Sequence, residues 1–92
     1  MPLVFEWDGR KARSNLEKHG VSFEEAATVF GDPLSLTIED SHHLETERRF
    51  IIMGLSVRGR VLVVAHTERV ERIRMISARM ATSAERRQYE ES

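Results

Sequence analysis

RFIIMGLS (residues 49–56), RVLVVAHT (60–67) and RIRMISA (72–78) are the stretches of this chain that predict consecutive strands. They contain the β-branched and aromatic residues that favour strands, and short polar connections separate them. The first connection includes Gly59, which can adopt the positive φ that a tight turn requires. Three strands joined in this way predict an antiparallel meander.

Two helices are predicted between an N-terminal strand at residues 3–7 and the meander. Asp8 is a suitable N-cap for the first helix, and Gly20 is a suitable residue to end it. Ser22 and Glu25 have the spacing of a capping box, and apolar residues follow them at helical spacing. A second helix is therefore expected to begin at Ser22.

The remaining elements complete an α+β fold. Residues 34–38 are expected to form a strand and residues 40–47 a polar loop, while Thr82 and Glu85 form a second capping box that begins a short C-terminal helix. The predicted order is β-α-α-β-β-β-β-α, in a single domain over residues 1–92. The simplest packing is an antiparallel sheet with helices packed on one face.

Composition excludes several classes of protein. The chain contains no cysteine, which excludes a disulfide framework and a zinc–thiolate site. Its longest apolar run, residues 61–65, is far shorter than the ~20 residues of a membrane helix. We therefore expect a cytoplasmic protein that makes no membrane contact. His42 and His43 are adjacent and have no partner at ligand spacing, so no metal and no cofactor are expected.

Charge is divided unevenly along the chain, although the net charge is only −1. Residues 1–47 contain four Lys or Arg and ten Asp or Glu, whereas residues 48–92 contain ten Arg and five Glu. Arginine favours planar, bidentate contacts with phosphate. The division suggests an anion-binding surface in the second half, but the two halves could also neutralise each other across the fold.

The last predicted strand separates its charged side chains from its apolar ones. Side chains of a strand alternate between faces, so Ile73 and Met75 should face the helices while Arg72 and Arg74 project from the open face. Arg79 follows the strand, where a bend could return it to the same side. We expect these guanidinium groups to converge on one pocket large enough for a phosphate.

Such a pocket could cleave RNA without a metal. The reaction needs a base for the 2′-hydroxyl, positive donors for the phosphoryl oxygens and help for the leaving 5′-oxygen. Arg74 and Arg79 could supply the donors, and Glu68 or His66 could be the base, with a histidine or lysine as the acid. Spacing does not separate Glu68 from His66. The alternative is a solvated Arg–Glu ladder with no chemical role.

Three blocks, which together span nearly the whole chain in order, resemble the BrnT family of toxins. They are FEWD (5–8) leading to KHGVSFEEA (18–26), ERR (47–49) leading to MGLS (53–56), and TER (67–69) leading through RIRMISAR (72–79) to Tyr89. The chain departs from the family at Met75 and Met80, which do not touch the proposed chemistry, and at His66.

The resemblance implies a RelE-like toxin fold and a metal-independent endoribonuclease. It also implies a cognate BrnA-like antitoxin with a ribbon-helix-helix domain, and operator DNA bound only through the antitoxin complex. The catalytic candidates that it implies are Lys18, His19, Glu68, Arg69, Arg74 and Arg79. Arg60, Arg72 and His66 are predicted to contact RNA.

A purely structural role can also explain some of these residues. Lys18 and His19 lie in the last turn of a predicted helix, where the helix dipole favours cations. Trp7 could stack on a base, but in so small a domain we predict that it lies in the core, as do Phe23 and Phe30.

Two other functions compete with the ribonuclease. The chain could be an inactive toxin homologue that acts as a corepressor, with its arginine face bound to an acidic segment of the antitoxin. It could also be a stand-alone RNA-binding domain.

Overall fold

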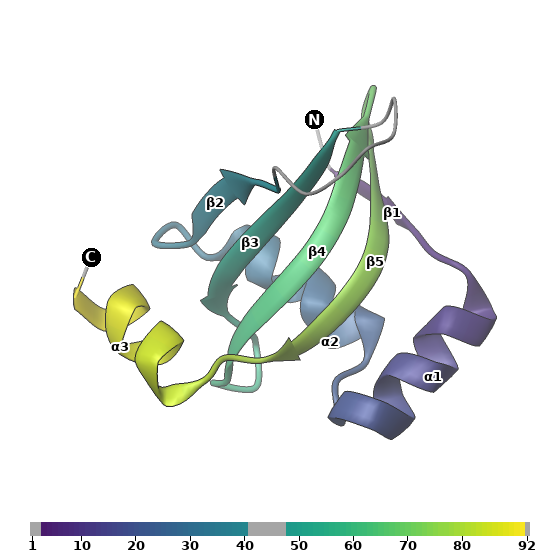
Figure 1. The fold of residues 1–92 in the computed structure, drawn as a ribbon. Helices are drawn as coiled ribbons and strands as arrows, with labels where there is room; N and C mark the ends of the chain where they lie inside the picture. Colours follow the sequence, from purple (N-terminus) through teal and green to yellow (C-terminus); the bar gives the residue numbers. More distant parts are fainter. Residues whose placement is uncertain (1–2, 41–47, 92) are drawn as a thin grey trace.

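The computed structural model describes residues 3–40 and 48–91, which form a five-stranded sheet flanked by helices (Figure 1). In chain order the elements are β1 (Val4–Glu6), α1 (Gly9–His19), α2 (Phe23–Thr28), the 3-10 helix η1 (Val29–Gly31), β2 (Leu36–Glu39), β3 (Arg49–Leu55), β4 (Val61–Arg69), β5 (Arg72–Met80) and α3 (Ser83–Glu91). The predicted α+β class and element order are confirmed. In the part of the chain that is described, no helix combines the length and the apolar character needed to cross a membrane.

The sheet has the strand order β1-β5-β4-β3-β2. Strands β2 to β5 form the predicted antiparallel meander. Strand β1 joins the edge in parallel with β5, with Val4 opposite Arg72 and Glu6 opposite Arg74. The sequence did not predict this parallel pairing, because a three-residue strand carries little information about its partner.

Local capping interactions explain where α1 and α2 begin and end. The Asp8 side chain accepts hydrogen bonds from the N–H groups of Arg10 and Lys11 at 2.7 and 3.2 Å. Gly20 ends α1 in the left-handed conformation, with φ of 68°. The Ser22 hydroxyl accepts from the N–H of Glu25 at 3.0 Å, which begins α2 as its capping box predicted.

The hydrophobic core lies between α2 and the sheet. Phe23, Leu62 and Met75 are among its largest fully buried side chains. Trp7 packs against this core as predicted, with its ring centroid 5.8 Å from that of Phe23. Gly54 of β3 lies so close to η1 that an added Cβ would be 2.9 Å from a side-chain carbon, so a larger residue here would displace η1.

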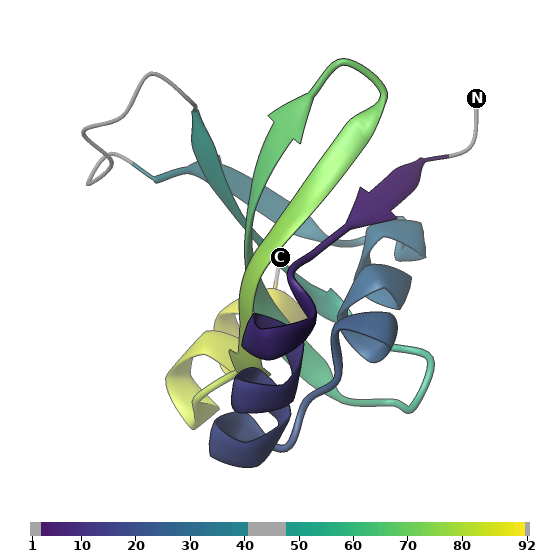
Figure 2. The same ribbon diagram turned by 90° about the vertical axis from the view of Figure 1, so that its right-hand side faces the viewer.

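The helices do not all lie on one side of the sheet (Figure 2). Helix α2 covers one face, α1 runs beside the β5 edge, and α3 lies toward the opposite face, which we call the open face. None of the described residues of α3 is buried. A hydrogen bond of 2.5 Å from the Tyr89 hydroxyl to Asp32 attaches the helix to the body of the protein.

Candidate functional site

A bulge in β5 places Arg79 on the open face. The register of β4 and β5 shifts by one residue, which leaves Ile76 without an opposite partner. Because side chains alternate along a strand, one extra residue moves all later side chains to the other face. Arg74 before the bulge and Ser77 and Arg79 after it therefore share the open face. The prediction that Arg79 returns to this side is confirmed, although the bend lies within the strand.

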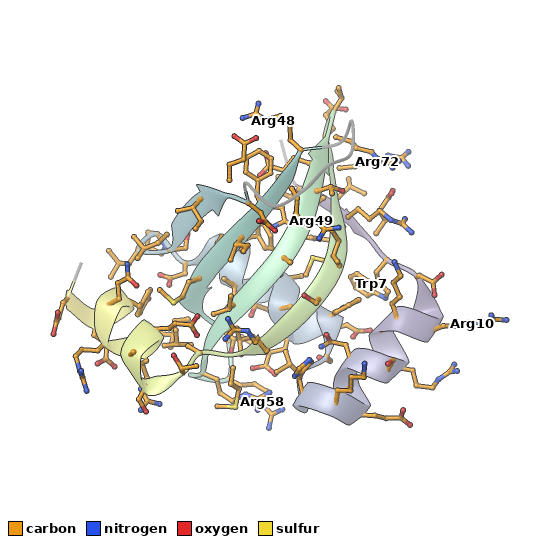
Figure 3. The ribbon with its side chains drawn as sticks, in the orientation of Figure 1. Trp7, Arg10, Arg48, Arg49, Arg58 and Arg72 are labelled. Atoms are coloured by element: carbon orange, nitrogen blue, oxygen red, sulfur yellow. The ribbon has the colours of Figure 1, made fainter. Side chains whose placement is uncertain are left out.

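The predicted alternation at the start of β5 is also confirmed. Ile73 and Met75 are buried in the core, whereas the Arg72 and Arg74 side chains are 64% and 37% exposed. Figure 3 shows Arg72 projecting beyond the upper part of β5. Nη1 atoms of both arginines lie near the Glu6 carboxylate, at 3.3 Å for Arg72 and 3.5 Å for Arg74. One carboxylate thus partners two cations, and the edge keeps a positive charge.

Arg79 is held from α3. Its guanidinium donates two hydrogen bonds to Glu85, at 2.7 and 2.9 Å. Glu85 also accepts from the N–H of Thr82 at 2.9 Å, as the second capping box predicted. The hydrogen bonds from Arg79 and then from Thr82 lower the pKa of Glu85 to about 2. Glu85 is therefore ionised, and it orients Arg79 along the open face.

The Arg79–Glu85 pair predicts a specific pH dependence of stability. The pKa of Glu85 is about 2 in the folded protein and near 4.5 when unfolded, so its contribution is full above about pH 4.5 and is lost as pH falls towards 2. Since both side chains are partly exposed, we expect Glu85→Gln to cost about 1 kcal/mol at pH 7 and almost nothing at pH 2. Urea unfolding at both pH values measures the difference.

Glu90→Gln is the matched control, because it removes the same charge from an exposed position of α3. It should change the free energy of unfolding little at either pH. An equal loss for Glu85→Gln at both pH values would contradict the assigned ion pair.

Arg74 and Arg79 do not converge on one pocket. Arg74 is drawn towards Glu6 of β1 and Arg79 towards Glu85 of α3, on opposite sides of the strand. At about 3.3 Å per residue their Cα atoms are roughly 15 Å apart. The predicted single arginine pocket is therefore wrong. The two arginines instead lie at the ends of one strip of the open face, with Ser77 between them. We call this strip the arginine strip.

A small cavity, which we call the seam pocket, opens beside Ser77. It has a volume of about 200 Å³ and lies between α1 and the bulge of β5. Its lining residues are Lys11, Ser14, Asn15, Lys18, His19, Ile76 and Ser77. The lining contains three basic side chains and no carboxylate, so the pocket is suited to an anion.

The seam pocket joins two predicted site residues to several that the sequence analysis missed. Lys18 and His19 lie in the last turn of α1, as expected. Lys11, Ser14 and Lys18 follow the helical spacing of three and seven residues, and this signal could have placed them on one face. Ser77 could not have been found in the same way, because its face depends on the bulge.

His66 and Glu68 lie on the other face of the sheet, so the prediction that they share the arginine face is wrong. His66 is fully buried, with its ring 4.8 Å from that of Phe30 and 5.9 Å from that of Phe50. Its Nε2 is 3.2 Å from Glu68, and its Nδ1 has no hydrogen-bond partner among the described residues. Because β4 is apolar at both parities, its sequence did not show which side chains face the core.

Arg60, predicted to contact RNA, is engaged in a largely buried ion pair. Its Nε donates to Glu25 at 2.9 Å, its Nη2 also binds Glu25, and Nη2 reaches the Gly20 carbonyl at 3.1 Å. The Glu25 side chain is only 4% exposed. The hydrogen bonds from Arg60 lower the pKa of Glu25 despite the opposing effect of burial. Arg60 is therefore bound to Glu25 within the fold and is not part of the arginine strip.

Arg69 and the adjacent pair His42 and His43 were also considered as site residues in the sequence. Arg69 is exposed at the end of β4, directly opposite Arg72 in the register. His42 and His43 lie outside the described residues. Within residues 3–40 and 48–91, no group of three or more His, Asp or Glu is arranged to hold a metal ion.

The other half of the open face is apolar. A groove of about 490 Å³ lies between α3 and the sheet, and we call it the apolar groove. Its apolar lining comes from β2, β3 and β4, namely Leu36, Ile38, Ile51, Met53 and Val63. Ile38 is 64% exposed. Exposed apolar surface of this kind commonly marks a binding surface.

Comparisons with known proteins agree with this architecture. A family profile described as "Ribonuclease toxin, BrnT, of type II toxin-antitoxin system" matches residues 7–85. A search of curated protein sequences finds no match. Among solved structures, the crystal structure of the Brucella abortus ribonuclease toxin BrnT is similar, with a TM-score of 0.67 and 19% sequence identity. The match covers 89% of this chain and 100% of the Brucella chain, and it supports the fold.

Proposed function

The chain belongs to the BrnT family of ribonuclease toxins of type II toxin–antitoxin systems, and from this premise we propose that it cleaves RNA at the seam pocket without a metal ion. The observation that carries the proposal is the lining of that pocket. Lys18 and His19 share one cavity with the strand that displays Arg74 and Arg79. Lys18 and His19 then serve as the general acid–base groups, and the arginines that bind phosphate project from the same strand on either side of the pocket.

RNA binds along β5 in this proposal. Arg74 and Arg79 are too far apart to share one phosphate, so they bind phosphates on either side of the seam pocket. The scissile phosphate then lies beside Ser77, within the cavity. An arginine has five N–H donors, so a carboxylate partner leaves donors for a phosphate. Arg72 extends the arginine strip toward the end of the hairpin that joins β4 and β5.

The reaction is an internal transfer of the phosphoryl group. His19 accepts the proton of the 2′-hydroxyl while the 2′-oxygen bonds to phosphorus. The bond from phosphorus to the 5′-oxygen breaks, and Lys18 supplies a proton to that leaving oxygen. The products are a 2′,3′-cyclic phosphate and a 5′-hydroxyl. Since the protein's own cations stabilise the phosphoryl charge, the mechanism requires no metal.

The partner in this proposal is a BrnA-like ribbon-helix-helix antitoxin, and operator DNA is bound only through the complex of the two proteins. The apolar groove and the arginine strip share the open face, so a segment with apolar and acidic residues could cover both. The same surface supports the second candidate function. In that case the chain is an inactive toxin homologue that serves as a corepressor.

Cleavage in EDTA tests the ribonuclease proposal. We expect the purified chain to cut single-stranded RNA in the presence of EDTA and to leave 2′,3′-cyclic phosphate ends. An RNA that carries a 2′-deoxy substitution at the cut site is the matched control, because it lacks the attacking oxygen and should remain intact there. Mass spectrometry of the products identifies the ends.

Two outcomes would contradict the proposal. RNA left intact at every pH, by protein whose fold is confirmed by circular dichroism, would remove the enzyme activity and favour the corepressor. Cutting of the 2′-deoxy control at the same position would instead exclude the internal transfer.

A further inference from the structure

Asn15 connects α1 to β5 through a set of buried hydrogen bonds. It is 6% exposed. Its Nδ2 donates to the carbonyl oxygens of Val21 at 2.9 Å and Ala78 at 2.8 Å. Its Oδ1 accepts from the N–H of Ala78 at 3.0 Å. One side-chain amide thus satisfies both backbone groups of a residue 63 positions away, and also the chain just beyond the end of α1.

The bonds to Ala78 replace a missing strand. Strand β1 pairs with β5 only at residues 72–74, so β5 has no strand neighbour on that side at Ala78. The amide of Asn15 pairs with the N–H and C=O of Ala78 as a peptide group of a neighbouring strand would. Ala78 lies directly between Ser77 and Arg79. Asn15 therefore fixes the part of β5 that faces the seam pocket.

Helix α1 has few other attachments to the body of the protein. Among its eleven residues, all of which the structure describes, Asn15 alone is buried. Ala12 packs partly against the core, but Leu16 is 50% exposed. Apolar contacts are not directional, so they allow a helix to slide along its neighbour. Hydrogen bonds require defined distances and angles, so those of Asn15 set the position of α1 along β5.

We infer that Asn15 is a positioning residue for the seam pocket. Through its hydrogen bonds, Asn15 holds Lys18 and His19 at a fixed distance from Ser77 and the scissile phosphate. The inference rests on the proposed function. Asn15 lines the seam pocket, but both sides of its amide are bound to the backbone, so the role assigned to it is to hold the neighbouring groups in place. A displacement of about 1 Å is enough to lower the rate of a positioned reaction about a hundredfold.

A double-mutant cycle tests the inference. Asn15→Asp keeps the acceptor for the Ala78 N–H but cannot donate to the two carbonyl oxygens. We expect it to lower kcat for RNA cleavage by tenfold or more, with less than a twofold change in KM. In the Lys18→Ala background the same substitution should lower kcat by less than twofold, because Lys18 and His19 act in one step and that step has already lost its positioned acid. Arg13→Ala, on the exposed side of α1, is the control for changes in the helix.

The outcomes separate this inference from the proposed function. If Lys18→Ala cleaves RNA like the wild type, the proposed function fails and the inference fails with it. If Lys18→Ala is slow and Asn15→Asp lowers kcat by the same factor in Lys18→Ala as in the wild type, the proposed function stands and the positioning role is overturned. Asn15→Ser is a second variant in case Asn15→Asp does not fold. Failure of both variants to fold would show that Asn15 is needed for folding, and this would also overturn the positioning role.

Discussion

Lys18→Ala is expected to slow RNA cleavage at least a hundredfold and to lower the stability of the protein by less than about 1 kcal/mol. Lys18 is exposed in the last turn of α1 and lines the seam pocket, so its side chain supports no buried contact. A positioned acid or base contributes about 10²–10⁴-fold to a rate. His19→Ala should cause a loss of similar size, and the double variant should lose little more, since both groups act in one step. Single-turnover cleavage measures the chemical step directly.

Arg10→Ala is the charge-matched control for this prediction. Arg10 also belongs to α1, but it points away from the sheet and does not line the pocket (Figure 3). It should weaken RNA binding slightly, through the general charge, and leave the chemical step unchanged. Wild-type cleavage rates for both Lys18→Ala and His19→Ala, in protein with an unchanged unfolding midpoint, would remove the seam pocket from the mechanism.

Arg60→Ala is expected to destabilise the protein by about 3 kcal/mol, which corresponds to a fall in Tm of roughly 12–24 °C for a domain of this size. The substitution leaves the Glu25 carboxylate buried without its main partner. It also removes the hydrogen bond to the Gly20 carbonyl at the end of α1. Thermal unfolding, followed by circular dichroism, measures the change.

Arg58→Ala is the matched control, because Arg58 lies two residues away and also approaches Glu25, at 3.8 Å. The Arg58 side chain is 67% exposed, so its removal should cost less than about 1 kcal/mol. The comparison also decides between two roles for Arg60. An Arg60→Ala variant with wild-type stability and weakened RNA binding would contradict the structural ion pair and support the RNA contact that the sequence suggested.

Patterns of near neighbours in the sequence predicted most of the secondary structure. The meander follows from three β-rich stretches, and the capping residues at Asp8, Ser22 and Thr82 begin the helices as expected. Alternation predicted that Ile73 is buried and that Arg74 projects from the open face. These features depend on residues a few positions apart, so they can be recognised without knowledge of the fold.

The candidate site was less predictable, because it depends on register and on distant pairs. A register shift at Ile76 decides the face of Arg79, and the packing of β4 decides that His66 is buried. The sequence alone also left Arg60 as a free cation, since Glu25 is 35 residues away.

Patterns along the chain were therefore enough to predict the elements, their order, their caps and the family that the chain resembles. The three-dimensional fold was needed to show which charged groups line the seam pocket and which are held in ion pairs within the protein. The physical reason is that an ion pair or an amide bridge such as Asn15–Ala78 forms between residues brought together by packing. No spacing along the chain encodes such a contact.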